Sequence, residues 1–261
     1  MEFKNKTVLI TGASSGIGAV FCSALAERGA KLVITARRED RLLEIARNLK
    51  DAHQAEVVVI TADLSSTDGV EKLYLEITEG GHQIDILINN AGFGYQGAFE
   101  DTDLKTYRDM MQLNMSSLTE LCYLFLPEMA ARGYGRVVNV ASMAGVIPMP
   151  YFSVYAATKA YVISLTEALW QEYKHKGVHI TALCPGPVAT EFFEVSGYNP
   201  SGADGRSIQT PQDVVEVALS AMHKNKRFAA TSLPLRILNG MQKFVPRKIA
   251  LAALAKNMKK S

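Results

Sequence analysis

Short apolar runs alternate with longer segments of helical periodicity along most of the chain, and this alternation restricts the possible folds more than any other feature. The runs, rich in Val, Ile and Leu, lie at residues 7–11, 31–36, 56–62, 85–91, 135–142 and 178–186. Helices are predicted between them, at residues 17–28, 41–50, 67–77, 104–132 (broken near Pro127) and 155–176. Strands separated by helices predict βαβ units, and near-continuous apolar strands indicate burial on both faces. We therefore expect an α/β fold with a doubly wound parallel sheet of about seven strands and helices on both faces.

The length of 261 residues is enough for one large α/β domain. No Pro-, Gly- or Ser-rich linker precedes residue 195, so a single domain over 1–261 is the simplest expectation. At 195–206 small and turn-forming residues predict a mobile substrate loop. A further helix is predicted to begin near Thr210 and Pro211, since proline is favoured at the first helical position.

The net charge of +2 conceals an uneven distribution of charge. Residues 217–261 carry ten Lys or Arg and no Asp or Glu, which leaves 18 basic and 26 acidic residues in the rest of the chain. The segment 232–261 is predicted to be a basic amphipathic extension. We favour a solvated helix face there; peripheral contact with an anionic membrane, cover over the active site and contact with a partner are the alternatives. No binding to nucleic acid is expected.

The three cysteines, Cys22, Cys122 and Cys184, form no CxxC pair, and the five histidines show no metal-ligand spacing. Neither a disulfide framework nor a metal site is predicted, and a reducing compartment is expected. The N-terminus lacks the apolar core of a signal peptide, and no stretch of about 18 apolar residues could span a membrane. A cytoplasmic location is the resulting expectation.

A glycine-rich segment, TGASSGIG, follows the first predicted strand and opens the first predicted helix. Gly12, Gly16 and Gly18 would let the backbone turn tightly and approach a ligand, and a helix N-terminus favours the negative charge of a pyrophosphate. The spacing is GxxxGxG rather than the GxGxxG of many dinucleotide-binding proteins, and a purely structural turn is the alternative. We expect a dinucleotide to bind at this loop.

The second predicted strand ends in ITARRED, which bears on the choice of dinucleotide. On such folds an Asp or Glu here binds the adenosine ribose 2′-hydroxyl, whereas an Arg accommodates a 2′-phosphate. Arg37 directly follows the strand and is the better candidate, with Arg38 second, because a guanidinium can hold a phosphate through two hydrogen bonds. NADP is therefore expected ahead of NAD.

Tyr155 and Lys159 lie four residues apart on a predicted helix, and so on the same face of it. A nearby ammonium can stabilise a tyrosinate and lower the pKa of a phenol from its ordinary value of about 10. Ser142 ends the fifth predicted strand, at the edge where open parallel sheets bind ligands, and its hydroxyl could orient a carbonyl oxygen. Each residue alone is common in surface or cap positions, but together with the glycine loop they predict an acid/base site.

These segments, in this order, resemble the short-chain dehydrogenase/reductase family of the single-domain type, with a Rossmann fold. The residues that carry the resemblance are TGASSGIG, the NNAG at 89–92, Asn114, Ser142, Tyr155 with Lys159, and Pro185-Gly186 with Thr190. The resemblance implies that Tyr155 is the general acid/base and that Ser142 orients the carbonyl. It implies that Lys159 binds the nicotinamide ribose and lowers the tyrosine pKa, and that Asn114 holds a water in a proton relay. Homo-oligomers are common in the family, through the helix with Tyr155 and its neighbour.

The resemblance also implies the cofactor contacts. Some NADP-preferring members of the family have a basic residue at the position of Ser15. Because this chain has a serine there, recognition of the 2′-phosphate is left mainly to Arg37 and Arg38. The expected contacts are Gly12, Ser14, Ser15, Gly16, Ile17 and Gly18 in the loop, Arg37, Arg38, Asp63, Leu64, Asn89, Ala91 and Gly92 around the adenosine, and Tyr155, Lys159, Pro185, Gly186, Val188 and Thr190 around the nicotinamide.

The segments where the family binds substrate are apolar and contain no Lys or Arg at residues 93–95, 143–152 and 192–193. A hydrophobic carbonyl compound, such as a steroid-like molecule or an acyl chain, is favoured over a small dicarboxylate, although lid packing would give the same pattern. The expected substrate contacts are Ser142, Met143, Tyr151, Tyr155 and Phe192.

The expected function is that of an NADP(H)-dependent oxidoreductase that interconverts a ketone and a secondary alcohol. A dinucleotide-binding regulatory or sensor protein on the same fold is the alternative. It would need the glycine loop but not the acid/base set, which is present. A cofactor-independent dehalogenase of this fold would be expected to lack the glycines.

Overall fold

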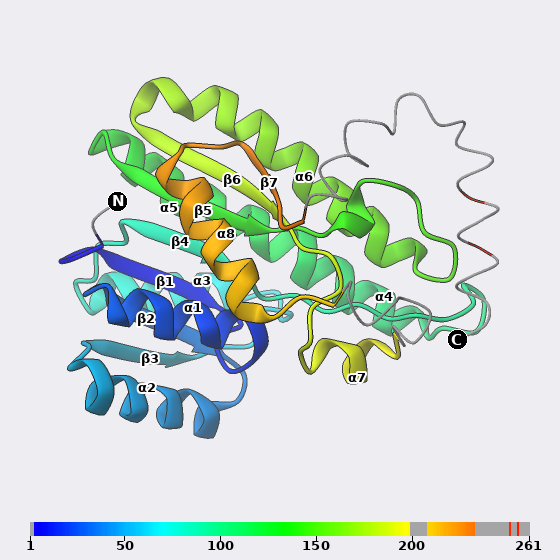
Figure 1. The fold of residues 1–261 in the computed structure, drawn as a ribbon, viewed down its shortest axis with the longest axis horizontal. Helices are drawn as coiled ribbons and strands as arrows, with labels where there is room; N and C mark the ends of the chain where they lie inside the picture. The colour runs from blue at the N-terminus through cyan, green and yellow to red at the C-terminus, as the bar shows by residue number, and fades with distance from the viewer. Residues whose placement is uncertain (1–2, 199–207, 233–250, 252–254, 256–261) are drawn as a thin grey trace.

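A computed structural model describes residues 3–198 and 208–232, together with 251 and 255. Within these residues one sheet has seven strands, in the order β3-β2-β1-β4-β5-β6-β7, and every neighbouring pair is parallel (Figure 1). The strands are β1 (Thr7–Thr11), β2 (Lys31–Ala36), β3 (Val57–Thr61), β4 (Ile86–Asn89), β5 (Gly135–Val140), β6 (Val178–Cys184) and β7 (Phe228–Ala230). The predicted doubly wound parallel sheet is confirmed.

Helices cover both faces of the sheet, as Figure 1 shows. One face is covered by α1 (Gly16–Glu27), α2 (Glu39–His53) and α8 (Pro211–His223), and the other by α3 (Gly69–Glu79), α5 (Leu118–Ala131) and α6 (Ser153–Tyr173). Two short helices, α4 (Leu104–Met111) and α7 (Phe192–Ser196), lie past the carboxyl ends of the strands.

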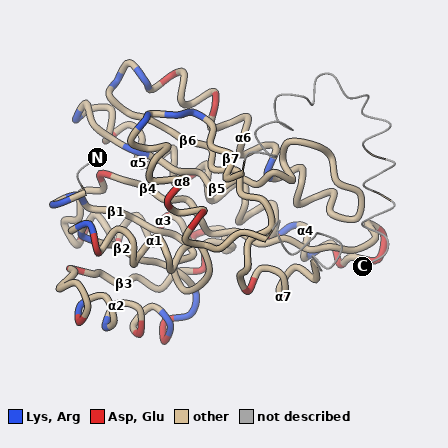
Figure 2. The backbone as a smooth tube through the Cα atoms, viewed as in Figure 1, with Lys and Arg blue, Asp and Glu red and all other residues tan. Residues whose placement is uncertain are grey.

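Each buried strand supplies side chains to two separate hydrophobic cores, because successive strand residues point to opposite faces. In β1, Val8 and Ile10 pack with residues of α1, α2 and α8, whereas Leu9 packs with residues of α3, α5 and α6. All three side chains are fully buried, which explains why the strands read as continuous apolar runs. Figure 2 shows the corresponding distribution of charge, with few charged residues in the sheet and both signs along α2.

The strand order reverses beside β1, and this reversal creates the crevice in which such sheets bind ligands. The chain extends from β1 through β2 to β3 on one side, and β4 then pairs with the other side of β1. Because all these strands are parallel, the glycine loop after β1 and the NNAG segment after β4 meet at the same edge.

The predicted helix over 104–132 is interrupted, but not where the sequence suggested. α4 passes into a π-helical turn, η1 (Gln112–Ser117), and α5 then continues through Pro127 without a break. The break predicted near Pro127 is therefore wrong, because α5 tolerates the missing N–H of the proline. The regular helix is interrupted instead by the wider i→i+5 turn. Such a turn leaves no signal in the apolar periodicity.

In the second half of the chain, one expectation is tested and two concern residues that are mostly outside the described part. β7 has three residues, too few for the pattern analysis to have found it. The helix predicted near Thr210 is confirmed, and the Thr210 side chain accepts a hydrogen bond from Asp213 N in a capping box. In the loop predicted at 195–206, Val195 and Ser196 belong to α7, and 199–207 lie outside the described residues, as does nearly all of 232–261.

In the part of the chain that the structure describes, every helix is too short or too polar to cross a lipid bilayer. The same residues include no group of three or more side chains that could hold a metal ion. The three cysteines are buried and unpaired.

Candidate active site

A cavity of about 560 Å³ lies along the carboxyl edge of the sheet, with the glycine loop in one wall and α7 in another. Most of the residues expected to contact cofactor or substrate line it. They are Gly12, Ser14, Ser15, Gly16, Ile17, Arg37, Arg38, Asp63, Leu64, Ala91, Gly92, Ser142, Met143, Tyr155, Lys159, Pro185, Gly186, Val188, Thr190 and Phe192. Four expected residues, Gly18, Asn89, Asn114 and Tyr151, are not part of the lining.

The glycine loop has a backbone that other residues could not adopt. Gly12 and Gly16 have φ angles of +63° and +55°, in the left-handed region that favours glycine. A Cβ on Gly12 would lie 2.9 Å from the Cα of Ala91. The amide of Asn90 donates to the carbonyl oxygens of Thr11 (3.0 Å) and Gly12 (3.1 Å), so the end of β4 fixes the shape of the loop.

The start of α1 is suited to an anionic ligand. Ser15 is the N-cap but makes no side-chain capping hydrogen bond, and the first turn contains no acidic residue. A helix N-terminus without a carboxylate of its own favours a phosphate placed beside it. Together with the cavity that Gly12 and Gly16 line, this fits the pyrophosphate of a dinucleotide.

Two arginines follow β2 at the edge of the cavity, and they have different surroundings. Arg38 donates from Nη2 to Glu191 Oε2 (2.9 Å) and lies 3.2 Å from Ser14 Oγ, so its guanidinium is held against the glycine loop. The positive charge of Arg37 acts on the carboxylate of Asp63. Slight burial raises the pKa of Asp63, but hydrogen bonds from Ser65 and the charge of Arg37 lower it more.

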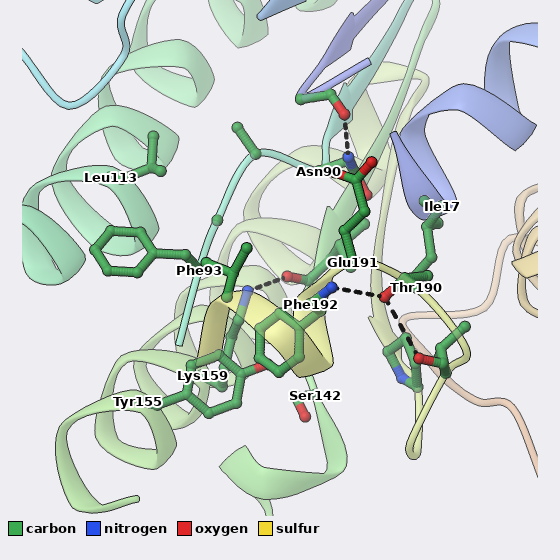
Figure 3. A pocket seen from close by; sticks show the side chains of 18 of the residues that line it. Ile17, Asn90, Phe93, Leu113, Ser142, Tyr155, Lys159, Thr190, Glu191 and Phe192 are labelled. Atoms are coloured by element: carbon green, nitrogen blue, oxygen red, sulfur yellow. Dashed lines mark hydrogen bonds between the residues drawn. The ribbon is translucent and has the colours of Figure 1, made fainter. Parts of the chain in front are cut away.

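Ser142, Tyr155 and Lys159 lie together in the wall of the cavity (Figure 3). Ser142 follows β5, and its hydroxyl accepts a hydrogen bond from Ala144 N at 3.1 Å, which fixes the side chain. Tyr155 and Lys159 come from the same face of α6, as their spacing predicts. The Lys159 ammonium lies 5.7 Å from the centroid of the Tyr155 ring.

Burial controls the pKa values of this pair. It raises the pKa of the Tyr155 phenol to about 12, against the opposing effect of a hydrogen bond with Ser142. It lowers the pKa of Lys159 to about 8. The Lys159 ammonium donates to the carbonyl oxygen of Val140 at 2.8 Å.

Asn114 lies behind the cavity wall rather than in it. Its side-chain oxygen accepts from Phe93 N (3.1 Å), and its amide donates to Phe93 O (2.9 Å) and Thr158 Oγ1 (3.1 Å). Its side chain therefore ties the π turn to the chain after β4. A Cβ on Gly92 would lie 2.9 Å from Asn114 Oδ1 and 3.4 Å from Lys159 Nζ, so Asn114 is close to Lys159 as well.

The other expected residues outside the lining have identifiable structural contacts. Asn89 is buried and donates to Asn139 Oδ1 at 2.9 Å, so it belongs to the core, and the next residue, Asn90, reaches the glycine loop. A Cβ on Gly18 would lie 2.2 Å from the carbonyl oxygen of Gly12, so this glycine allows α1 to pack behind the loop. Tyr151 has a φ of +60° and packs against the cluster that contains Phe152 and Tyr155, without lining the cavity.

The end of the cavity near Tyr155 is apolar and largely aromatic. The ring of Phe192 lies 5.4 Å from that of Tyr155, and the ring of Phe152 lies 4.5 Å from it, measured between centroids. Tyr198 stacks on Phe152 at 6.0 Å. Met143, Ile147 and Met149 complete this end of the wall. Figure 3 shows Phe192 over the Tyr155 ring.

The turn that follows Ser142 packs directly on α6. It is a 3₁₀ turn, η2 (Met143–Gly145). A Cβ on Gly145 would lie 2.5 Å from the backbone carbonyl carbon of Lys159 and 2.6 Å from its oxygen. Only glycine permits this contact, which holds Ser142 in a fixed position relative to Tyr155 and Lys159.

Some lining residues were not expected from the sequence. Asn90 was inside the NNAG segment and could have been found by asking which amide faces the loop. Glu191 follows Thr190 directly, but nothing in the sequence linked it to Arg38. Leu113 lines the cavity because of the π turn, which the sequence pattern did not reveal.

Comparisons with known proteins agree with this geometry. The sequence pattern of the short chain dehydrogenase family matches residues 6–199. The ketoacyl reductase HetN of Nostoc sp. is 36% identical over 221 residues, 85% of this chain and 76% of its own length. The very-long-chain 3-oxoacyl-CoA reductase of Rattus norvegicus is 34% identical over 72% of this chain, which spans 61% of that relative.

The solved structures include a close match in the same family. A short-chain dehydrogenase from Sphingobium yanoikuyae, in complex with NADPH, has a TM-score of 0.83 and 31% sequence identity, covering 91% of this chain and 94% of its own. The parallel sheet accords with these matches. This chain therefore belongs to the short-chain dehydrogenase family of oxidoreductases.

Proposed function

We propose that this protein is an NADP(H)-dependent oxidoreductase that interconverts a hydrophobic ketone and the corresponding secondary alcohol. The observation that carries the proposal is the placement of Ser142, Tyr155 and Lys159 in one cavity with the glycine loop. A hydride acceptor or donor and an acid/base group must reach the same substrate carbon and oxygen, and a single cavity that holds both kinds of site meets this requirement.

Tyr155 would donate a proton to the carbonyl oxygen during reduction and accept it during oxidation. Ser142, which hydrogen-bonds the phenol, would donate to the same oxygen and stabilise its developing charge. Lys159 would compensate the negative charge on the phenol as its proton leaves. A bound nicotinamide dinucleotide would supply or receive the hydride. The aromatic cluster would exclude water from the reacting atoms.

Arg38 and Arg37 support a preference for NADP(H). The sequence favoured Arg37 for contact with the 2′-phosphate, but the position of Arg38 beside Ser14 of the glycine loop leads us to propose Arg38 in its place. We expect Arg38→Gln to raise the Kd of NADPH about tenfold or more, since hydrogen bonds to charged groups contribute roughly 1.5–3 kcal/mol. Binding of NADH should change little. Fluorescence titration with both dinucleotides measures this, with Arg37→Gln in parallel. Equal weakening of NADPH and NADH would contradict the assignment.

The apolar end of the cavity supports a hydrophobic substrate, as do two relatives whose names describe ketoacyl and very-long-chain 3-oxoacyl-CoA reductases. We expect kcat/KM with NADPH to rise along a series of ketones of increasing chain length, by about fourfold per buried methylene at roughly 0.8 kcal/mol each, until the cavity is filled. Loss of NADPH absorbance across the series, with a small dicarboxylic ketone as the comparison, tests this. A higher kcat/KM for the dicarboxylate would contradict the proposed substrate class.

A further inference from the structure

Glu191 is a carboxylate in the wall of a cavity that is otherwise suited to anions at this end. Of the described lining residues, two are acidic, Asp63 and Glu191. Asp63 accepts hydrogen bonds from the backbone and the hydroxyl of Ser65, so its carboxylate is engaged within its own loop. The carboxylate of Glu191 instead accepts a hydrogen bond from Arg38.

The contact between these two residues joins distant parts of the chain. Glu191 begins the segment of α7, after β6, whereas Arg38 follows β2. Arg38 Nη2 donates to Glu191 Oε2 at 2.9 Å, and the same nitrogen lies 3.2 Å from Ser14 Oγ. Their side chains are 44% and 46% exposed, so water can replace either partner and the pair can open.

Glu191 accepts a hydrogen bond from Nη2 of Arg38, so a phosphate bound at that nitrogen would compete with the carboxylate for it. Such a phosphate would also place two negative charges beside one guanidinium, which is unfavourable unless the carboxylate moves away. On the basis of the proposed preference for NADP(H), we propose that Glu191 is a specificity-determining residue that competes with the cofactor 2′-phosphate for Arg38 and thereby limits the affinity for NADP(H).

The expected size of this competition follows from the fraction of molecules in which Arg38 is free. An exposed ion pair worth about 1 kcal/mol is formed in roughly five sixths of the molecules. The apparent Kd for a ligand that needs a free Arg38 is then about sixfold higher than its intrinsic value. A ligand without a 2′-phosphate has no such requirement.

The test uses two adenosine fragments that differ by the 2′-phosphate, 2′,5′-ADP and 5′-AMP, titrated calorimetrically into the full-length protein. Glu191→Gln is expected to tighten 2′,5′-ADP binding about sixfold and to leave 5′-AMP binding unchanged. The matched control is Glu194→Gln, an exposed carboxylate on the same short helix, which should alter neither affinity. In an Arg38→Gln background, Glu191→Gln should have no effect on 2′,5′-ADP.

Each outcome separates this inference from the broader proposal. If the wild type prefers 2′,5′-ADP but Glu191→Gln leaves the ratio of the two affinities unchanged, the competition is refuted and the NADP(H) preference stands. If Glu191→Gln shifts both affinities equally, Glu191 acts only on the loop or on α7, and the inference also fails. If neither the wild type nor Glu191→Gln prefers 2′,5′-ADP, both the preference and the competition are overturned.

Discussion

Replacement of Tyr155 by phenylalanine is expected to lower kcat about a thousandfold, because a positioned general acid or base contributes roughly 10²–10⁴ to the rate. The change removes only the hydroxyl, so the ring keeps its packing against Phe152 and Phe192, and the melting temperature should change little. NADPH binding should also be retained. The rate of NADPH oxidation with a hydrophobic ketone, measured beside a thermal unfolding curve, checks both expectations.

Tyr161→Phe is the matched control for this experiment. Tyr161 lies on the same helix, α6, and its hydroxyl hydrogen-bonds Thr119 Oγ1 at 2.8 Å, outside the cavity lining. Its loss should leave kcat unchanged. Turnover by Tyr155→Phe equal to that of the control would remove Tyr155 from the mechanism.

Replacement of Lys159 by methionine is expected to abolish most activity and at the same time to stabilise the fold. Loss of the charge that compensates the tyrosinate should lower kcat about a hundredfold or more. Burial lowers the pKa of Lys159 to about 8, which means that the folded protein holds the cation at a cost. Methionine has a similar length and no charge, so removal of the buried cation should raise the free energy of unfolding near neutral pH by about 1–3 kcal/mol. The loss of the hydrogen bond to the Val140 carbonyl oxygen offsets part of this gain.

The gain in stability should depend on pH in a defined direction. In wild type the folded-state pKa of Lys159 lies below the value of about 10.5 for a free lysine, so the cost is fully present below pH 8. The cost is relieved as the pH rises from about 8 toward 10.5. Within this range the folded protein has lost the proton, whereas the unfolded chain still binds it, so stability increases with pH. Urea unfolding of both proteins across this range measures the difference, with the exposed Lys50→Met as control. A variant less stable than wild type at neutral pH would show that the ammonium contributes net stability.

The architecture was predictable because its physical cause is visible in the sequence. Strands buried on both faces must be apolar at every position, so β1 to β6 were recognised as runs, and the crossover helices between them imply a parallel sheet. β7 was not recognised, because three residues carry no periodicity. The π turn at 112–117 was missed for a related reason: one inserted residue shifts the helix without altering which residue types it contains.

At the candidate site, the motifs predicted which residues lie close together. They did not predict the direction in which each side chain points. The positions of Ser142, Tyr155 and Lys159 in one cavity followed from their places at strand and helix ends. The direction in which a side chain points did not follow, since neighbouring strand residues face opposite ways. Asn89 therefore lies in the core and Asn90 at the glycine loop, although the sequence presents them as equals.

The sequence pattern did not predict side-chain contacts between residues that are far apart in the chain. The contact between Arg38 and Glu191 joins residues 153 positions apart, and it depends on how α7 lies over the glycine loop. The same holds for the direction of the Lys159 ammonium, which is fixed by the carbonyl of Val140 rather than by its spacing from Tyr155.

The close contact between Gly145 and the backbone of Lys159 joins the turn after Ser142 to α6. Ser142, Tyr155 and Lys159 lie on these two joined segments and form one body, so a substitution that shifts one of them is expected to shift the others. The opposite wall, formed by Phe192, Phe193 and Tyr198, is joined to this body only by side-chain contacts. Divergence toward a new substrate, whether by evolution or by engineering, is therefore open at residues 192–198 and restricted at 142–145.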